Sequence, residues 1–564
     1  MKPSPDPSAQ AETAYGGIGT PLRDPIFRRI WSTSLLSNLG QQMQAVAAAW
    51  VMLEITRAAD LVALVQSASM LPVMLFALPS GALADMYDRR KVAVAALFLS
   101  LLGASLLAFA SLASVISPIV ILAGVFVTGT GISLYAPAWQ ASVAELVGPR
   151  ALPAAISLYA MSSNAARSLG PAIGGFVVAS AGALAAFSVN AVLYLPLLAA
   201  LLLWRREVPP PRLPPERLDR AIGAGLRYVR HSQQLRRAIF RSMLAGVGGA
   251  AIYALLPLVA DEMLGGGAKT YGLLLGGFGL GAVGLAAIAS TIQARFAPER
   301  VACLSSLALA AAIMIIATST SLGLTITAMV FAGGSWMILI ATYNVSIQLA
   351  SPRWVSGRTL AAFQVGIAGG LAGGAALWGF IAEELGVEAT LIITSGFVAF
   401  TATIGLVASL TRPVAPEQAP PPARDPIVQM ALTGTSGPVV IEIAYQVRNE
   451  NAREFYHAMR AVIRSRERNG AFATSLRRDI SNPLLWVEQF TYTTWDDYLR
   501  ARNRPTSADR SLRDQAYAFH MRDELPVIRL YLERPTGSVR WSDDAIDPGQ
   551  ALPGPVGPVP FSPN

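Results

Sequence analysis

One arginine inside an otherwise uncharged apolar stretch is the residue of this sequence with the clearest chemical meaning. Arg167 lies in the middle of residues 153–180, which hold no other charged side chain. A charge at membrane depth is costly, so Arg167 is expected to face the protein interior or a watery path, where it would attract an anion. The structural alternative is a hydrogen bond to helix carbonyls, to Asn164 or to Asn190.

Other polar side chains in apolar segments are candidates for the same path. Each of them alone is more often a hydrogen-bonding contact between helices than a ligand. Acidic residues are scarce at this depth, because Glu54, Asp60, Asp261 and Glu262 all fall near the ends of apolar segments. The sequence therefore contains no central carboxylate that could carry a proton. The candidates beside Arg167 are Asn164, Gln41, Gln44, Tyr135, Gln140, Tyr343, Asn344, Gln348 and Gln364.

A second group of charged residues follows the second apolar segment. Asp85 can face a helix N-terminus, whose partial positive charge favours an anion. Gly81 allows close helix packing, and Arg89 can pair with Glu145 at the end of the fourth segment. Such a cluster would hold one side of the molecule closed in one state and break in another; the alternative is a basic loop that only fixes topology. The charged members of this group are Asp85, Asp88, Arg89, Arg90 and Lys91.

No constellation for catalysis or metal binding occurs in the sequence. His457 and His520 are solitary, and the one cysteine, Cys303, excludes an intrachain disulfide and a cysteine-based metal site. We therefore expect no catalytic residue, no metal and no cofactor.

The elements that must position these residues are membrane helices. Of the 564 residues, 53% are hydrophobic and 14% are charged, whereas a soluble domain carries about 25% charged residues. A helix that spans a bilayer needs roughly 20 mostly apolar residues. Segments of this kind recur between residues 29 and 410, and we count twelve of them. The predicted fold is an all-α membrane protein of twelve transmembrane helices, followed by a soluble α+β domain.

Arginine and lysine are distributed unevenly among the loops. Loops on one side carry nearly all of them, including Arg89, Arg90 and Lys91, whereas the other side has only Arg57 and Lys269. By the positive-inside rule both termini are cytoplasmic. The formal charge of +9 then reflects cytoplasmic loops, and no nucleic-acid partner is expected.

The two halves of the apolar region are related in sequence. A shift of 208 residues pairs Tyr135 with Tyr343 and Gln140 with Gln348 at equivalent helix ends. Two six-helix halves of this kind support rocking of one half against the other around a site at the membrane midplane. The predicted halves are residues 27–204 and 239–411, after an N-terminal segment, 1–26, that is predicted to be disordered.

The segment between the halves, residues 205–238, is basic. Leu218, Ile222, Leu226 and Val229 recur at helical spacing, with arginines on the other faces. This pattern predicts an amphipathic helix on an anionic lipid surface. A simple tether between the halves is the alternative.

A soluble domain, residues 431–540, is predicted after a proline-rich linker, 412–430. Residues 439–447 alternate apolar and polar side chains, as a half-buried strand does. Asn451 and Glu454 start a helix. A hairpin, a second helical region and a last strand follow, so that the order β, α, β, β, α, β is ferredoxin-like. Residues 541–564 are predicted to be a disordered tail.

Two motifs carry a resemblance to a known family. Residues 81–91 resemble the loop motif of the major facilitator superfamily, although Met86 stands for a usual basic residue and Asp88 for a usual glycine. The corresponding stretch of the second half, 289–295, lacks both glycine and acid, so any charge latch is expected on one side only. A glycine-proline motif similar to that of export members of the superfamily is a predicted bend or hinge, with packing alone as the alternative; it consists of Gly170, Pro171, Gly174 and Gly175.

Two further resemblances refine these expectations. The run from Tyr135 to Arg167 resembles a subgroup that contains enterobactin-type siderophore exporters and transmembrane secretion effectors. The soluble domain is similar to the dimeric α+β barrel group, which includes the antibiotic-biosynthesis monooxygenases. The resemblance to the transporter family implies proton coupling and a small-molecule substrate. The resemblance to the dimeric α+β barrel group implies dimerisation through the soluble domain.

Three hypotheses follow. The preferred one is a secondary active exporter of a siderophore, drug or other secondary metabolite that works by alternating access and is not an enzyme. The second is a bifunctional protein whose tail oxidises or binds the transported molecule. The third is a transporter-like sensor that moves nothing.

Overall fold

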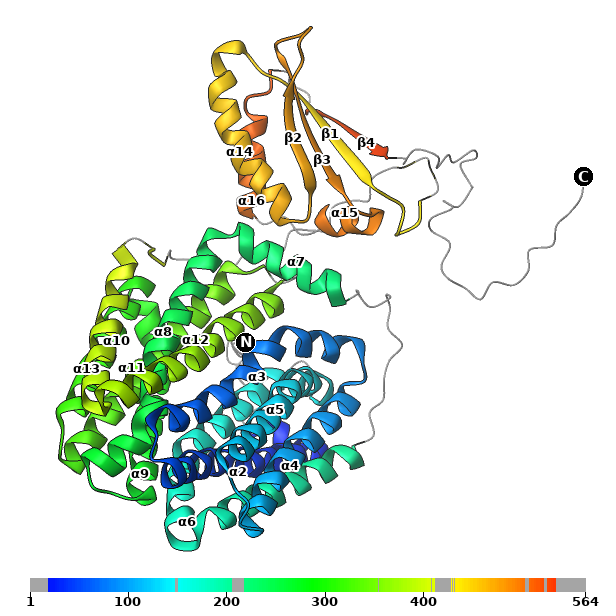
Figure 1. Cartoon of the computed structure of the whole chain (residues 1–564). Helices are drawn as coiled ribbons and strands as arrows, with labels where there is room; N and C mark the ends of the chain where they lie inside the picture. The colour runs from blue at the N-terminus through cyan, green and yellow to red at the C-terminus, as the bar shows by residue number, and fades with distance from the viewer. Residues whose placement is uncertain are drawn as a thin grey trace, which may run out of the picture. The chain divides into compact units, whose positions relative to one another are not determined.

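The computed structural model describes residues 19–147, 151–204, 218–352, 355–406, 408–410, 428, 430, 432–502, 507–521 and 525–533. The chain forms two compact units. The first is a helical body made by most of the chain up to residue 413, and the second contains a small β-sheet from the C-terminal part (Figure 1). Residues 227–233 group with the second unit.

The first half of the helical body follows a short 3-10 turn, Thr20–Arg23. Asp24 caps its first helix by accepting hydrogen bonds from the N–H groups of Ile26 and Phe27. The helices of this half are α2 (Pro25–Thr56), α3 (Ala59–Met86), α4 (Arg89–Leu112), α5 (Pro118–Leu146) and α6 (Leu152–Leu203).

The second half begins after α7 (Leu218–His231), a helix that lies where the sequence predicts an amphipathic one. The first helix of this half, α8, continues directly as a π-helical turn, and a 3-10 turn, Ile404–Leu406, follows the last. The helices are α8 (Gln233–Leu258, then Val259–Met263), α9 (Ala268–Arg295), α10 (Pro298–Thr318), α11 (Leu322–Ala350), α12 (Ser356–Leu385) and α13 (Val387–Thr403).

Within the described ranges, ten helices are long and apolar enough to cross a membrane. One of them, α6, has 52 residues and breaks at Gly182, where φ is 77°, a backbone conformation that glycine adopts readily. It therefore covers two of the predicted segments, whereas α2, which covers the first predicted segment, is not among the ten. The protein is a mostly helical, multi-pass membrane protein, and the count of twelve spans stays a prediction.

The helix connections fall at two ends of the body, because successive helices run in opposite directions. The Arg57 end holds the turns at Arg57, Gly182 and Gly386, and the Arg89 end holds the turns at Asp88 and Phe296. Apolar side chains of both halves form one continuous core that includes the residues next to the Arg57 end. A second core belongs to the first half alone.

The second unit contains a four-stranded antiparallel sheet with strand order β2-β3-β1-β4. Its helices α14 and α16 lie side by side against one face of the sheet (Figure 1). The elements are β1 (Val439–Gln446), α14 (Ala452–Arg468), β2 (Phe472–Arg478), β3 (Leu485–Tyr492), α15 (Trp495–Arg502), α16 (Ser507–Tyr517) and β4 (Val527–Leu532).

Strand β1 has one buried and one half-buried face. Val439, Ile441, Ile443 and Tyr445 are buried and share a core with Phe455 of α14. Alternate side chains of a strand point to opposite faces. The alternation in the sequence therefore correctly predicts which face of this strand is buried against the helices.

Candidate functional site

Arg167 lies midway between Leu152, where α6 begins, and the break of this helix at Gly182. At about 1.5 Å per residue, each of these two points is roughly 22 Å away. The Arg167 side chain is exposed, and among the described residues it makes no hydrogen bond or ion pair. Asn190, one of the alternative partners, is fully buried and donates a hydrogen bond to Gln44 instead. The charge therefore sits at mid-depth without a hydrogen-bonding partner in the described part of the chain.

One aromatic side chain of the second half, Tyr253, lies near Arg167. The phenol of Tyr253 in α8 is close enough to interact electrostatically with the guanidinium. Tyr253 packs edge-on against Phe278 of α9, with ring centroids 5.3 Å apart. A guanidinium beside an aromatic ring suits a planar anion, because the cation attracts the charge and the ring can pack against the planar part.

Helices α6 and α9 join the two halves through glycines. A Cβ atom added to Gly175 would lie 2.7 Å from the Cα of Gly272, and one added to Gly272 would lie 2.8 Å from the Cα of Gly175. Further along, a Cβ on Gly279 would lie 2.4 Å from the Cα of Ser168. No side chain fits at such distances, so this contact requires small residues.

The other glycines of the predicted hinge motif face the interior of the first half. A Cβ on Gly170 would lie 2.5 Å from the Cβ of Gln42, and one on Gly174 would lie 2.8 Å from the Cα of Met43, both in α2. The carbonyl oxygen of Pro171 lies next to Gly272. The motif thus fastens α6 to α2 on one side and to α9 of the opposite half on the other.

Polar contacts join the halves at the Arg57 end. The Nη1 atom of Arg57 lies 2.9 Å from Oδ2 of Asp261, but the Arg57 side chain is 70% exposed, so this ion pair contributes little. Glu383 near the end of α12 accepts a hydrogen bond of 2.6 Å from the N–H of Ala59, the first residue of α3. A carboxylate is favoured there by the partial positive charge of the helix N-terminus.

Contacts between α3 and α12 continue toward the middle of the body. The Ser67 hydroxyl donates a hydrogen bond of 2.7 Å to the carbonyl oxygen of Ala372. A Cβ on Gly369 would lie 3.1 Å from the sulfur of Met74, a residue in the middle of α3. These contacts between the halves therefore run from the Arg57 end to about the depth of Arg167.

The predicted loop motif lies at the Arg89 end. Asp88 caps α4 by accepting a hydrogen bond of 3.0 Å from the N–H of Lys91. Arg89 donates a hydrogen bond of 2.9 Å to the carbonyl oxygen of Ala141 in α5, one turn before Glu145. The side chains of Asp85 and Glu145 lie outside the described part of the structure, so the predicted latch between Arg89 and Glu145 stays a prediction. A Cβ on Gly81 would meet no atom within 4 Å in this conformation.

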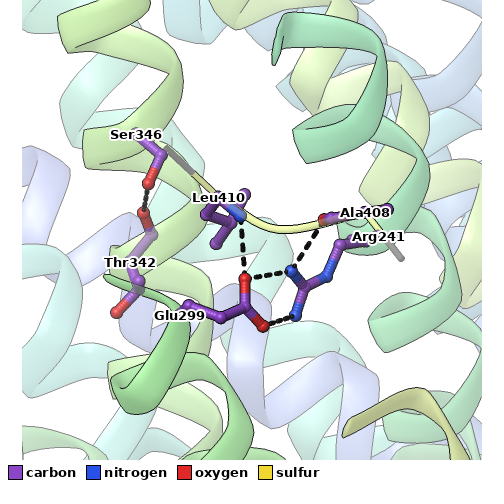
Figure 2. Close-up of polar contacts among 6 residues, drawn as sticks. All are labelled: Arg241, Glu299, Thr342, Ser346, Ala408 and Leu410. Atoms are coloured by element: carbon purple, nitrogen blue, oxygen red, sulfur yellow. Dashed lines mark hydrogen bonds and ion pairs between the residues drawn. The ribbon is translucent and has the colours of Figure 1, made fainter. Parts of the chain in front are cut away.

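The second half has an ion pair at the same end, and the sequence analysis missed it. Arg241 in α8 and Glu299 in the first turn of α10 form two parallel hydrogen bonds of 2.6 and 2.9 Å (Figure 2). Glu299 also accepts from the N–H of Leu410 at 2.8 Å, and Arg241 donates to the carbonyl oxygen of Ala408 at 3.2 Å. The Arg241 side chain is only 2% exposed. A buried bidentate pair of this kind fixes both helices and the chain beyond α13.

The two halves anchor their last helices at equivalent places. In the first half, Arg90 donates a hydrogen bond of 2.8 Å to the carbonyl oxygen of Leu201, near the end of α6, and another to Leu202. The sequence repeat relates Leu202 to Leu410, which Glu299 holds in the second half. The same structural task is thus performed by one arginine in the first half and by an ion pair in the second.

The remaining path candidates do not contact Arg167 through any described hydrogen bond. Gln44 is buried and donates to the Thr128 hydroxyl at 3.2 Å. The hydroxyl oxygens of Tyr135 and Ser34 are 3.3 Å apart, and Tyr343 lies under the guanidinium of Arg241, 5.7 Å from the ring centroid. The half-buried candidates are Gln41, Asn164 and Asn344, and the exposed ones are Gln140, Gln348 and Gln364, of which Gln348 donates to Asn344.

Arg241 carried a sequence signal that was not used. It lies near the start of the predicted second half, residues 239–411, in an otherwise uncharged apolar stretch, where a charge marks a buried partner or a function. Glu299 and Glu383 carried no comparable signal, because acids at helix ends resemble ordinary loop charges.

A buried polar network lies between the helices and the sheet of the second unit. The Tyr445 hydroxyl donates a hydrogen bond of 2.9 Å to Glu488, and Nε of Arg466 donates one of 3.3 Å to the same carboxylate. Burial, followed by the charge of Glu488, raises the pKa of Tyr445 well above its ordinary value. Burial acts to lower the pKa of Arg466, but Glu488 and the neighbouring side chains of Tyr492, Tyr445 and Tyr517 together outweigh it, so the pKa is raised. Tyr445 is therefore neutral and Arg466 is charged.

Comparisons with known proteins match the helical body and reach into the C-terminal part. A family model described as transmembrane secretion effectors matches residues 17–536. The staphyloferrin A transporter of Staphylococcus aureus (strain NCTC 8325 / PS 47) is 24% identical over 249 residues, which are 43% of this chain and 62% of that protein. The multidrug efflux pump Tap of Mycobacterium tuberculosis (strain ATCC 25618 / H37Rv) is 28% identical over 226 residues, 38% of this chain and 53% of the pump.

The chain thus spans less than two thirds of the length of these curated relatives. A solved structure of a bacterial homologue of the human lysosomal transporter Spinster, in an inward-facing and occupied conformation, matches with a TM-score of 0.56 and 14% identity, covering 69% of this chain and 97% of that one. At that identity the likeness concerns the fold. Together with the family match over residues 17–536, it identifies the chain as a member of the transmembrane secretion effector family of the major-facilitator type, whose members are transporters and not enzymes.

Proposed function

We propose that this protein exports a small molecule across the cytoplasmic membrane by alternating access. The observation that carries the proposal is the position of Arg167. It is an exposed charge at mid-depth, and the described contacts between the two halves run from the Arg57 end to about its depth. A site at the midplane between two repeat-related halves is what rocking of the halves would expose to each side in turn.

The basic loops support an orientation for this movement. Arg90 and Lys91 lie beside Arg89 at the Arg89 end, and by the positive-inside rule this supports a cytoplasmic Arg89 end and an external Arg57 end. With both termini in the cytoplasm, the conformation described here is closed toward the outside. α7 would then lie at the cytoplasmic membrane surface, next to lipid headgroups.

The substrate we propose is a small anionic molecule, a siderophore, drug or other secondary metabolite. Arg167 would hold its negative charge, and Tyr253 would pack against its planar part. The names of the two curated relatives, a siderophore transporter and a drug efflux pump, support this range. We also propose that transport is coupled to protons, on the basis of the family resemblance. None of the described contacts identifies a residue that carries the proton.

The C-terminal unit is proposed to be a ferredoxin-like regulatory or dimerising module. Its strand order and antiparallel pairing support that fold. The sheet face turned away from α14 and α16 carries Val440, Ala444, Val527 and Tyr531 at paired positions. Val527 and Tyr531 are exposed, so this face could pack against a second copy.

Transport into inverted membrane vesicles tests the proposal. The vesicles would be given a polycarboxylate siderophore and a panel of anionic and neutral drugs, with the wild type compared with Arg167→Ala and Arg167→Lys. We expect wild-type uptake of at least one anionic compound, loss on Arg167→Ala and partial retention on Arg167→Lys. The matched control is Arg295→Ala, which removes an exposed arginine at the end of α9. Absence of uptake for every compound with the wild type would favour the sensor hypothesis.

A further inference from the structure

A small cavity lined by arginines lies in the C-terminal unit, apart from the proposed transport path. Its lining comes from α14, from the end of β3, from α15 and from α16. The cavity has a volume of about 40 Å³. Since a single water molecule needs on the order of 10–15 Å³ of such space, the cavity has room for a small polyatomic group and not for an aromatic ring system. Its polar lining consists of Ser465, Arg466, Asn469, Tyr492, Asp509, Arg510 and Arg513.

The acidic charges at the cavity are already neutralised. Asp509 accepts hydrogen bonds from Arg468, from the Ser465 hydroxyl and from Asn469, and it is 7% exposed. Glu488, behind the cavity wall, is 1% exposed and is paired with Arg466. Each buried carboxylate thus has its own arginine, as buried acids require.

The two remaining arginines, Arg510 and Arg513, are positive charges in excess. Among the described residues, Arg510 has no ion pair or hydrogen bond. Arg513 has one acidic neighbour, Asp514, at 3.5 Å, and the Asp514 side chain is 65% exposed to solvent. Water screens such an exposed carboxylate, so it compensates little of the charge.

Several N–H groups at the cavity also lack a protein acceptor. The Asp514 contact is made by the buried Nε atom of Arg513, which lies 3.5 Å from Oδ1 of Asp514 but has no hydrogen-bond partner in the described part of the chain. The guanidinium of Arg466 lies over the ring of Phe490 and donates to a described residue through Nε alone, so its two terminal nitrogens, on a side chain that is 24% exposed, are available to a bound group. Buried donors in folded proteins are nearly always paired. A group that brings several acceptor oxygens and negative charge would satisfy these donors together.

We propose that this cavity is a binding site for a small oxyanion, either a phosphate group or a carboxylate group. Arg510 and Arg513 supply the charge, and the terminal nitrogens of Arg466 supply hydrogen bonds. A guanidinium presents its donors in a fork that matches both anions. The size of the cavity limits the bound part to one such group, so that a larger molecule would enter with its anionic head only.

Titration of the full-length protein in nanodiscs tests this site. Inorganic phosphate is added at constant ionic strength, and binding is followed by isothermal calorimetry for the wild type, the double variant Arg510→Gln/Arg513→Gln, and the control Arg453→Gln. Arg453 is an exposed arginine at the start of α14, away from the cavity lining. We expect saturable binding to the wild type and the control, with affinity at least tenfold weaker in the double variant.

A second double variant and a competition experiment complete the test. If the double variant fails to fold, Arg510→Lys/Arg513→Lys keeps the charges and loses the forked donors, and we expect it to bind more weakly than the wild type while folding normally. Acetate is expected to compete with phosphate, since both use the same donors; phosphate binding that acetate cannot displace contradicts the shared oxyanion chemistry. Equal phosphate titrations for the wild type and the arginine variants would overturn the proposal.

Discussion

Arg241 and Glu299 form a bidentate ion pair at the Arg89 end, with Nη1 of Arg241 2.6 Å from Oε2 and Nη2 2.9 Å from Oε1 of Glu299. The pair links α8 to α10, and through Leu410 it holds the chain just after α13. The second half of the body therefore has an ion pair that links its helices at this end, although it lacks the glycine and acid of the first-half loop motif. It uses different residues at different positions.

Removing one partner of this pair is expected to cost much more than removing both. Glu299→Gln leaves the buried Arg241 charge uncompensated, and we expect a loss of about 3 kcal/mol in stability. The double variant Arg241→Met/Glu299→Met removes both charges and is expected to be destabilised less than either single variant. Thermal unfolding in detergent measures this. Additive losses would show that the two side chains do not act as a pair.

Closure of the Arg57 end is expected to depend on the glycine contact between α6 and α9. A leucine at Gly272 cannot fit against Gly175, so Gly272→Leu should shift the protein toward a conformation that is open at the Arg57 end. Spin labels on either side of this contact, in a background without Cys303, would report the shift as a longer distance. Gly284→Leu is the control on the same helix, because a Cβ there meets no atom within 4 Å; equal distances in both variants would contradict the steric argument.

Glu383 is expected to stabilise the same closed end through its hydrogen bond to the Ala59 N–H. A hydrogen bond to a charged group contributes about 1.5–3 kcal/mol, but Glu383 is exposed and solvent reduces this contribution, so Glu383→Gln should raise the population that is open at the Arg57 end only modestly. The labels used for Gly272→Leu measure this population. Glu384→Gln, at the neighbouring exposed position, serves as the control and should leave it unchanged.

The C-terminal unit is expected to lose stability at high pH. The pKa of Tyr445 is raised above its ordinary value of 10.0, first by burial and then by Glu488. The contribution of Tyr445 to the stability of the folded unit is therefore complete below pH 10. It declines as the pH rises above 10, because the unfolded chain releases the phenolic proton and the folded chain does not. Hydrogen exchange of β1 in the full chain between pH 9 and 11 measures this. Tyr445→Phe should flatten the decline; an unchanged slope would assign the effect to other groups.

Much of the architecture is predictable from the sequence, because the signals are strong and local. Long apolar stretches predict the helices, and the alternation around Ile441 and Ile443 predicts β1 with its buried face. The predicted hinge motif lies on α6. Which of its glycines contact α2 and which contact α9 depends on the direction that each glycine faces in the packed structure, and the sequence does not give that direction. The break of α6 at Gly182 falls just after residue 180, where the sequence predicts that one apolar segment ends.

The polar contacts across the fold are much less predictable. Arg167 and Arg241 are both arginines in apolar segments, yet the first has no hydrogen-bonding partner among the described residues and the second is paired with the half-buried carboxylate of Glu299. Glu299 lies 58 residues from Arg241 along the chain, and no local pattern joins them. Gln44 is a polar contact within the first half, because Thr128 and Asn190 lie beside it in the folded chain.

The central claim is that Arg167 lies on a path that opens alternately to the two sides of the membrane. The most direct test is the labelling of Arg167→Cys, in a background without Cys303, by a membrane-impermeant thiosulfonate applied to right-side-out and to inverted vesicles. The account predicts labelling from the cytoplasmic side in the conformation described here, and labelling from the outside once Gly272→Leu opens the Arg57 end. A cysteine at this position that is labelled from neither side in either background would contradict it.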